Sequence, residues 1–91
     1  MVAAVVLMRA ERDHIKRAAQ EVAGIEGVAE VYSVSGEWDL VAIIRVDAWE
    51  KIATVVTEGL AQIAGLQRTQ TLVAFRVYSA QDLESAFDMF E

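Results

Sequence analysis

The chain contains no cysteine, no proline and no asparagine among its 91 residues. Without cysteine it can form no disulfide, no iron–sulfur cluster and no thiolate zinc site. Small secreted domains usually depend on such cross-links, so the composition favours a cytoplasmic protein. The sequence also lacks the basic start and cleavage site of a signal peptide, and no apolar stretch of about 18 residues is free of charge, so we expect no membrane span.

Positive charge is also scarce. Eight Lys and Arg residues stand against 14 Asp and Glu residues, and the formal net charge is −6. A domain that binds nucleic acid by itself usually carries a basic face, whereas these cations are scattered along the chain. We therefore expect no direct contact with nucleic acid.

Apolar residues are abundant, because 55% of the chain is hydrophobic. A single domain spanning residues 1–91 has one small core, which needs less apolar material than this. Since no membrane span is expected, the excess predicts that the domain covers apolar surface with copies of itself.

The two halves of the chain repeat one pattern at an offset of 38 residues, the distance from Ile25 to Ile63. Strand-like segments are expected at 2–8, 28–35, 40–46 and 66–78, and each half reads strand, helix, strand. This order predicts an α+β, ferredoxin-like βαββαβ fold, with a four-stranded antiparallel sheet and two helices on one face.

Helical spacing marks the two helices between these strands. Asp47 and Glu50 resemble a capping box at the start of the second helix. The apolar stripe of the first helix comprises Ile15, Ala18, Ala19 and Val22, and that of the second comprises Trp49, Ile52, Ala53, Val56, Leu60, Ile63 and Ala64.

The open face of the sheet needs a cover, because segment 2–8 is apolar on both of its sides. A second subunit packed sheet against sheet is the simplest cover. Residues 79–91 form a tail beyond the 1–78 core. Leu83, Ala86, Phe87 and Phe90 have helical spacing, which predicts a short C-terminal helix docked on its own or a neighbouring subunit.

The residues that usually carry catalysis are sparse. His14 is the only histidine, and no acidic cluster with ligand spacing stands out, so we expect neither a metal site nor a cofactor. No common nucleophile or nucleotide-binding motif is present. These observations argue against an enzyme.

One polar constellation stands out at the expected hairpin, where Gly36, Trp38 and Asp39 lie close together in the sequence. Turn amides beside Gly36 can bind a carboxylate, and Asp39 can bind an ammonium group. Thr69 and Thr71, on one face of the last strand, add hydroxyl groups. A plainer interpretation also stands: Gly36 makes the turn, Asp39 satisfies turn amides, and the threonines are ordinary strand residues.

Three segments resemble the effector-binding domain of the Lrp/AsnC (feast/famine) regulators, the RAM domain. They are the turn motif at 34–40, the last-strand motif at 68–73 and the helix exit at 25–28, and the resemblance runs from about residue 2 to residue 77. Full regulators of this family carry a helix-turn-helix domain before the effector-binding domain. The first strand is expected to begin at Val2, so the chain resembles a stand-alone form.

The resemblance implies dimers formed through sheet packing, which assemble into rings, commonly of four dimers, with amino-acid effectors bound between dimers. It places Gly36, Trp38 and Asp39 in the effector-binding turn and matches Thr69 and Thr71 to the facing strand. We therefore expect an amino-acid-sensing domain that modulates regulation of amino-acid metabolism, with full-length regulators of the same family as candidate partners. The alternatives are a small dimeric α/β-barrel enzyme, such as a monooxygenase or isomerase, and a purely structural assembly module.

Overall fold

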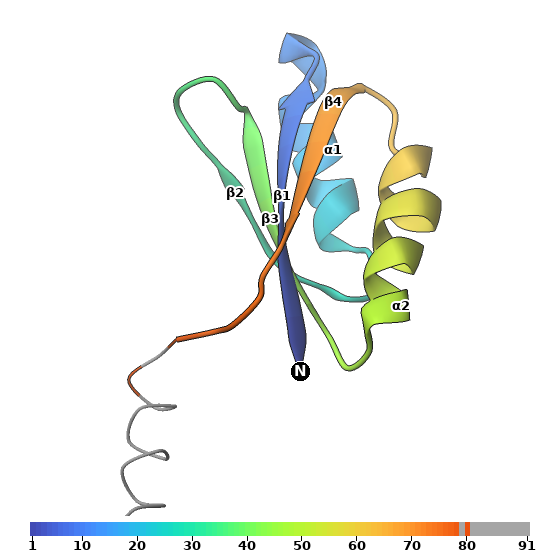
Figure 1. Cartoon of the computed structure of the whole chain (residues 1–91). Helices are drawn as coiled ribbons and strands as arrows, with labels where there is room; N and C mark the ends of the chain where they lie inside the picture. Colours follow the sequence, from blue (N-terminus) through green and yellow to red (C-terminus); the bar gives the residue numbers. More distant parts are fainter. Residues whose placement is uncertain (79, 81–91) are drawn as a thin grey trace, which may run out of the picture.

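The computed structural model describes residues 1–78 and 80, and it confirms the ferredoxin-like fold (Figure 1). Neighbouring strands run antiparallel in the order β2-β3-β1-β4. Both helices cover the same face of the sheet. The elements are β1 (Val2–Ala10), η1 (Arg12–His14), α1 (Ile15–Ala23), β2 (Val28–Ser33), β3 (Leu40–Val46), α2 (Trp49–Ala53), η2 (Thr54–Gly59), η3 (Leu60–Gln62) and β4 (Leu66–Val73).

The core lies between the sheet and the helices, and strand β1 shows how the two faces differ. Ala4, Val6 and Met8 are fully buried toward the helices. The alternate residues Val5 and Leu7 project to the opposite face, where the chain's own residues cover them only in part. Because β1 lies between β3 and β4, its outer side chains occupy the middle of the open face.

Helix α1 presents the predicted apolar stripe to the sheet. Ala18 and Val22 are buried, and Ile15 and Ala19 pack against the same core. The helix ends at Ala23, and the amide of Gly24 donates to the carbonyls of the last turn.

The second helical segment is less regular than the predicted four-turn helix. Only Trp49–Ala53 is α-helical, and a π-helical segment and a 3-10 turn follow. The hydroxyls of Thr54 and Thr57 donate to the carbonyls of Glu50 and Ala53, at 3.3 Å and 2.6 Å. Such bonds from threonine to a carbonyl four residues back compete with the regular helical pattern and often accompany bends.

The prediction that Trp49 belongs to the buried stripe is wrong, since 55% of its surface is exposed. Ala53 and Ala64 are exposed as well, whereas Ile52 and Leu60 are buried. Trp49 and Ala53 are the first and last residues of α2 and lie before η2. The wide turns of η2 shift the angular position only of the residues that follow, so the regular period no longer describes the segment by Ala64.

The predicted capping box at the start of α2 is also absent. The N-cap is Ala48, and its side chain makes no capping hydrogen bond to the first turn. Asp47 instead pairs with Lys51 across one turn, with Oδ1 and Nζ 2.7 Å apart. The hydrogen bond and charge of Lys51 lower the pKa of the Asp47 carboxyl, and those of Asp47 raise the pKa of Lys51.

Two strands end earlier than predicted because their partners end. Strand β2 stops at Ser33, which pairs with Leu40, the first residue of β3. Strand β4 stops at Val73 rather than at residue 78, and one more bond joins the Ala74 amide to the Ala3 carbonyl at 2.9 Å. Beyond that point β1 offers no partner, and the chain runs away from the domain (Figure 1). The predicted C-terminal helix lies outside the described residues.

Candidate functional site

The turn between β2 and β3 is held at its base and open at its tip. The Val34 amide donates to the Asp39 carbonyl at 3.0 Å, which closes the base. Gly36 has φ +112, a conformation that favours glycine. No heavy atom outside its chain neighbours lies within 4 Å of the position that a Cβ would occupy, so the tip is accessible.

Asp39 connects this turn to the end of β1 through two hydrogen bonds. Its amide donates to the Met8 carbonyl at 2.9 Å, and its Oδ2 accepts from the Ala10 amide at 3.0 Å. The carboxylate thus satisfies a partly buried amide just beyond the last pair of the β1–β3 ladder, Met8 with Leu40. This hydrogen bond supports the plainer interpretation, in which Asp39 satisfies a backbone amide near the turn, and it uses only one of the two carboxylate oxygens.

Trp38 lies beneath the guanidinium group of Arg68, whose Cζ is 5.2 Å from the ring centroid. This distance is within the range of a cation–π interaction. Arg68 of β4 pairs directly with Arg9 of β1, and both project to the open face, opposite the buried Met8. The sequence prediction did not include Arg68 as a site residue. Strand alternation places Arg68 on the face opposite Thr69, so a site sought around the two threonines leaves Arg68 out.

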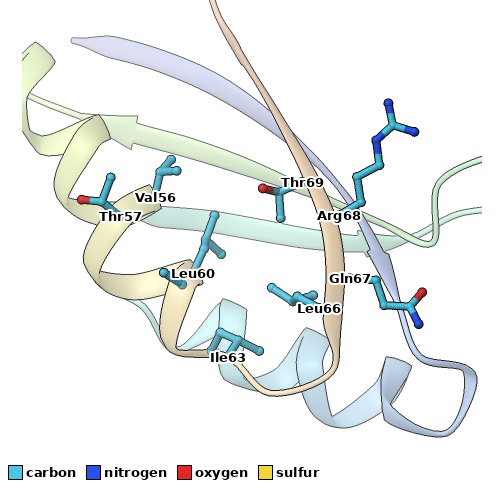
Figure 2. Close-up of a pocket in the computed structure, with 9 residues that line it drawn as sticks. Val56, Thr57, Leu60, Ile63, Leu66, Gln67, Arg68 and Thr69 are labelled. Carbon is cyan, nitrogen blue, oxygen red and sulfur yellow. The ribbon is translucent and has the colours of Figure 1, made fainter.

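Thr69 and Thr71 lie on the helix-covered side of the sheet. They pair with Met8 and Val6, whose side chains form the core. Figure 2 shows Thr69 on the same side of β4 as Leu66, facing a groove between β4 and the second helical segment, whereas Arg68 points away. Within one chain, therefore, the two threonines and the Trp38–Arg68 pair lie on opposite faces.

The strand register nevertheless brings the turn and the start of β4 to one end of the sheet. Met8 pairs with Leu40 on one side and with Thr69 on the other. Two strand spacings of about 4.8 Å therefore place Leu40 and Thr69 about 10 Å apart at their Cα atoms. Asp39, Trp38 and Arg68 all lie at this end.

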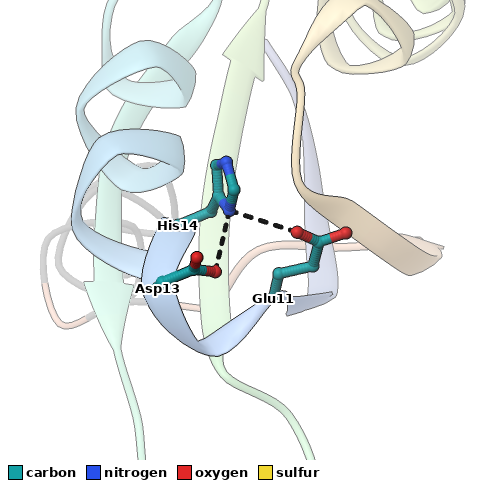
Figure 3. Close-up of side chains that lie close together, drawn as sticks. All are labelled: Glu11, Asp13 and His14. Atoms are coloured by element: carbon teal, nitrogen blue, oxygen red, sulfur yellow. Dashed lines mark hydrogen bonds and ion pairs between the residues drawn. The ribbon is translucent and has the colours of Figure 1, made fainter.

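A second cluster of polar side chains was missed by the sequence analysis. The Nδ1 atom of His14 lies 3.0 Å from Oδ1 of Asp13 and 3.2 Å from Oε2 of Glu11 (Figure 3). These residues lie at and just before the 3-10 turn η1, which brings positions three apart, here Glu11 and His14, onto one side, while Asp13 directly precedes His14. The spacing Glu-x-Asp-His was the available signal.

Comparison with known proteins decides the family. The model of the Lrp/AsnC ligand-binding domain matches residues 3–83. The chain belongs to the Lrp/AsnC family. A Pyrococcus furiosus protein described as an uncharacterized HTH-type transcriptional regulator is 40% identical over 60 residues, which are 66% of this chain and 40% of that protein. The chain therefore matches well under half the length of this relative.

Solved structures confirm the fold of this Lrp/AsnC domain. A Thermus thermophilus protein is 42% identical with a TM-score of 0.82, over 87% of this chain and 99% of that one. A hypothetical protein of Pyrococcus horikoshii is 26% identical with a TM-score of 0.77, over 86% and 94%. A Neisseria meningitidis transcriptional regulator, solved as a complex with L-Met, shares the fold at 16% identity and a TM-score of 0.74, over 86% of this chain and 52% of its own.

The described residues include no helix long and apolar enough to cross a membrane. In the same part of the chain no polar side chain is buried, so the space between sheet and helices is filled by apolar groups.

Proposed function

We propose that this Lrp/AsnC domain senses a free amino acid, assembles with copies of itself and thereby modulates regulation of amino-acid metabolism, acting with full-length regulators of its family. The observation that carries the proposal is the grouping of Asp39, Trp38 and Arg68 at one end of the sheet. The L-Met complex of the Neisseria meningitidis relative supports a ligand of this class.

The chemistry of an amino acid fits these groups. Arg68 can bind the ligand's carboxylate through two parallel N–H donors, and Asp39 can accept from its ammonium group. One oxygen of Asp39 already accepts from Ala10, and a carboxylate has further acceptor positions. The ring of Trp38 offers an apolar surface for the ligand's carbon atoms.

The position of Thr69 and Thr71 supports a site completed by another copy. Both threonines are on the edge strand, and Thr69 faces a groove of about 470 Å³. Because the two halves of the predicted site occupy opposite faces of one sheet, a single ligand meets both only where two chains adjoin. The ligand would then favour the assembled form, since it binds that form and not the isolated chain.

The open face of the sheet supports assembly. Val5 and Leu7 of β1 lie beside Val41 and Ile43 of β3 and Leu72 of β4, and Leu72 is 46% exposed. Beyond β4, the side chain of Phe75 is 99% exposed. A second copy that covers this face would bury apolar surface that one chain leaves in water.

The test is titration calorimetry of the assembled protein with each standard amino acid. Arg68→Gln removes the cation and Asp39→Asn removes the anion while keeping an acceptor oxygen for Ala10. A charge-assisted hydrogen bond contributes about 1.5–3 kcal/mol, so each variant should bind about ten- to a hundredfold more weakly. Arg17→Gln is the matched control, because Arg17 is exposed on α1 and pairs only with Glu21 among the described residues.

Two results would refute the sensing role. If no amino acid binds the wild type at millimolar concentration, the assembly-module alternative replaces it. If Arg68→Gln and Asp39→Asn bind as tightly as Arg17→Gln, the ligand lies elsewhere on the domain.

A further inference from the structure

We propose that Glu11, Asp13 and His14 form a binding site for a divalent transition metal ion of the zinc class. The site is separate from the amino-acid site and does not depend on it. It needs one chain only, because all three donors come from four consecutive residues.

The spacing of the donor atoms fits a shared metal ion. His14 Nδ1 lies 3.0 Å from Asp13 Oδ1 and 3.2 Å from Glu11 Oε2, and the three donors are all within 4.8 Å of one another. Ligands at about 2.1 Å from a metal are about 3.0 Å apart at a right angle and about 3.4 Å apart at the tetrahedral angle. The two distances from His14 are thus already those of neighbouring ligands around one ion (Figure 3).

The backbone holds this arrangement in place. The Glu11 amide donates to the Gly65 carbonyl, and the His14 amide donates to the Glu11 carbonyl, both at 2.8 Å. Gly65 has φ +89, and a Cβ there would lie 2.7 Å from the Cβ of His14. The histidine is therefore packed against the backbone at the start of β4, which reduces the ordering that a metal must impose.

The donor types select the metal. A neutral imidazole with two carboxylates suits Zn²⁺, Ni²⁺, Cu²⁺ or Mn²⁺, whereas Mg²⁺ and Ca²⁺ prefer oxygen ligands alone. The imidazole must bind through Nδ1, so its remaining proton sits on Nε2. Asp13 is largely exposed, and three protein ligands leave coordination positions for water or another ligand.

The experiment titrates Zn²⁺ and, separately, Mg²⁺ into protein from which any histidine tag has been removed. We expect Zn²⁺ binding, with Mg²⁺ at least about tenfold weaker. Nitrogen-15 spectra of the single imidazole should show Zn²⁺ on Nδ1, and Mn²⁺ should broaden the amide signals of Glu11 to His14 and of Gly65 first. His14→Gln and Glu11→Gln should each weaken Zn²⁺ binding by about tenfold or more. The control Glu50→Gln removes an equal charge from the exposed start of α2 and should bind Zn²⁺ like the wild type.

Melting curves of each variant without metal check that the fold is intact. If His14→Gln fails to fold, Glu11→Gln and the imidazole spectrum of the wild type decide the matter. The proposal is overturned if Zn²⁺ does not bind at millimolar concentration, if it binds without perturbing the imidazole, or if Glu11→Gln binds as tightly as Glu50→Gln. An amino-acid titration that fails leaves these results unaffected, since no site residue is shared.

Discussion

Adjacent residues of β1 offer a sharp test of self-association. Val5 projects to the open face and Val6 to the core, where Val6 has no exposed surface. The same substitution, Val→Asp, therefore places a carboxylate in two different environments separated by one residue. We expect Val5→Asp to give a folded monomer and Val6→Asp to give an unfolded chain.

The magnitudes follow from what surrounds each position. An unpartnered polar group costs about 1–3 kcal/mol to bury, and more when charged. A symmetric dimer of Val5→Asp buries two such carboxylates, which oppose association by about 2–6 kcal/mol or more, or at least about thirtyfold in Kd. At position 6 the described core has no polar side chain to pair with the carboxylate. The loss there combines that penalty with about 1.5–3 kcal/mol of lost valine burial, against a total stability of about 5–15 kcal/mol.

Sedimentation velocity across a concentration series measures association, and circular dichroism measures folding. Val5→Thr, of nearly the same shape, serves as the control and should associate more tightly than Val5→Asp. A wild type that sediments as a monomer at micromolar concentration, or a Val5→Asp variant as associated as the wild type, would refute the assignment of the open face to a partner copy.

Three further outcomes are expected. Gly65→Ala should destabilise the domain by more than the roughly 1–2 kcal/mol that the left-handed backbone alone costs, because the new Cβ would also collide with the Cβ of His14. Gly36→Ala should stay near that cost, because its surroundings are open, and equal melting temperatures for the two variants would contradict this. Phe75→Ser should weaken self-association, read by sedimentation, without lowering the melting temperature of the monomeric Val5→Asp background, because Phe75 is 99% exposed in one chain. Lys51 lowers the pKa of Asp47 from its ordinary value of 3.8, so the ion pair stabilises the fold above pH 3.8. This stabilisation is lost as the pH falls through the lowered pKa of the folded state. The small difference in melting temperature between the wild type and Asp47→Asn should therefore vanish at acidic pH.

The sequence predicted the sheet well because each strand carries its own signal. The apolar run beginning at Val2 and the segment Leu40–Val46 have the composition of buried strands, and both formed. Strand ends were predicted less well, since they depend on the partner: β4 stops where β1 begins, although mostly apolar residues, interrupted by Arg76, continue to Tyr78. The second helix was misread at both of its ends: Trp49, the first residue of α2, is exposed, and beyond η2 the regular helical period no longer holds.

The candidate site was predicted by residue type but not by face. Thr69 and Thr71 were correctly placed together on one side of the last strand, yet the sequence alone did not show that this side is the helix-covered one. Arg68 was overlooked for the same reason. Register across three strands decides which side chains meet, and no local pattern in β4 contains that information.

The cluster at η1 illustrates the opposite case, in which the three residues are close in the sequence but no ligand spacing was seen among them. With regular helical geometry, Asp13 and His14 point in different directions, so Glu11, Asp13 and His14 do not read as a group. The strand β1 ends at Ala10, whose amide bonds to Asp39, and the next amide, that of Glu11, bonds to Gly65. These two consecutive bonds tie the chain to its neighbours on both sides of β1 and force a tight turn before α1 can begin. The convergence of the three donors is therefore a consequence of how the strand is anchored, and it would be lost in a variant that released the Glu11–Gly65 bond.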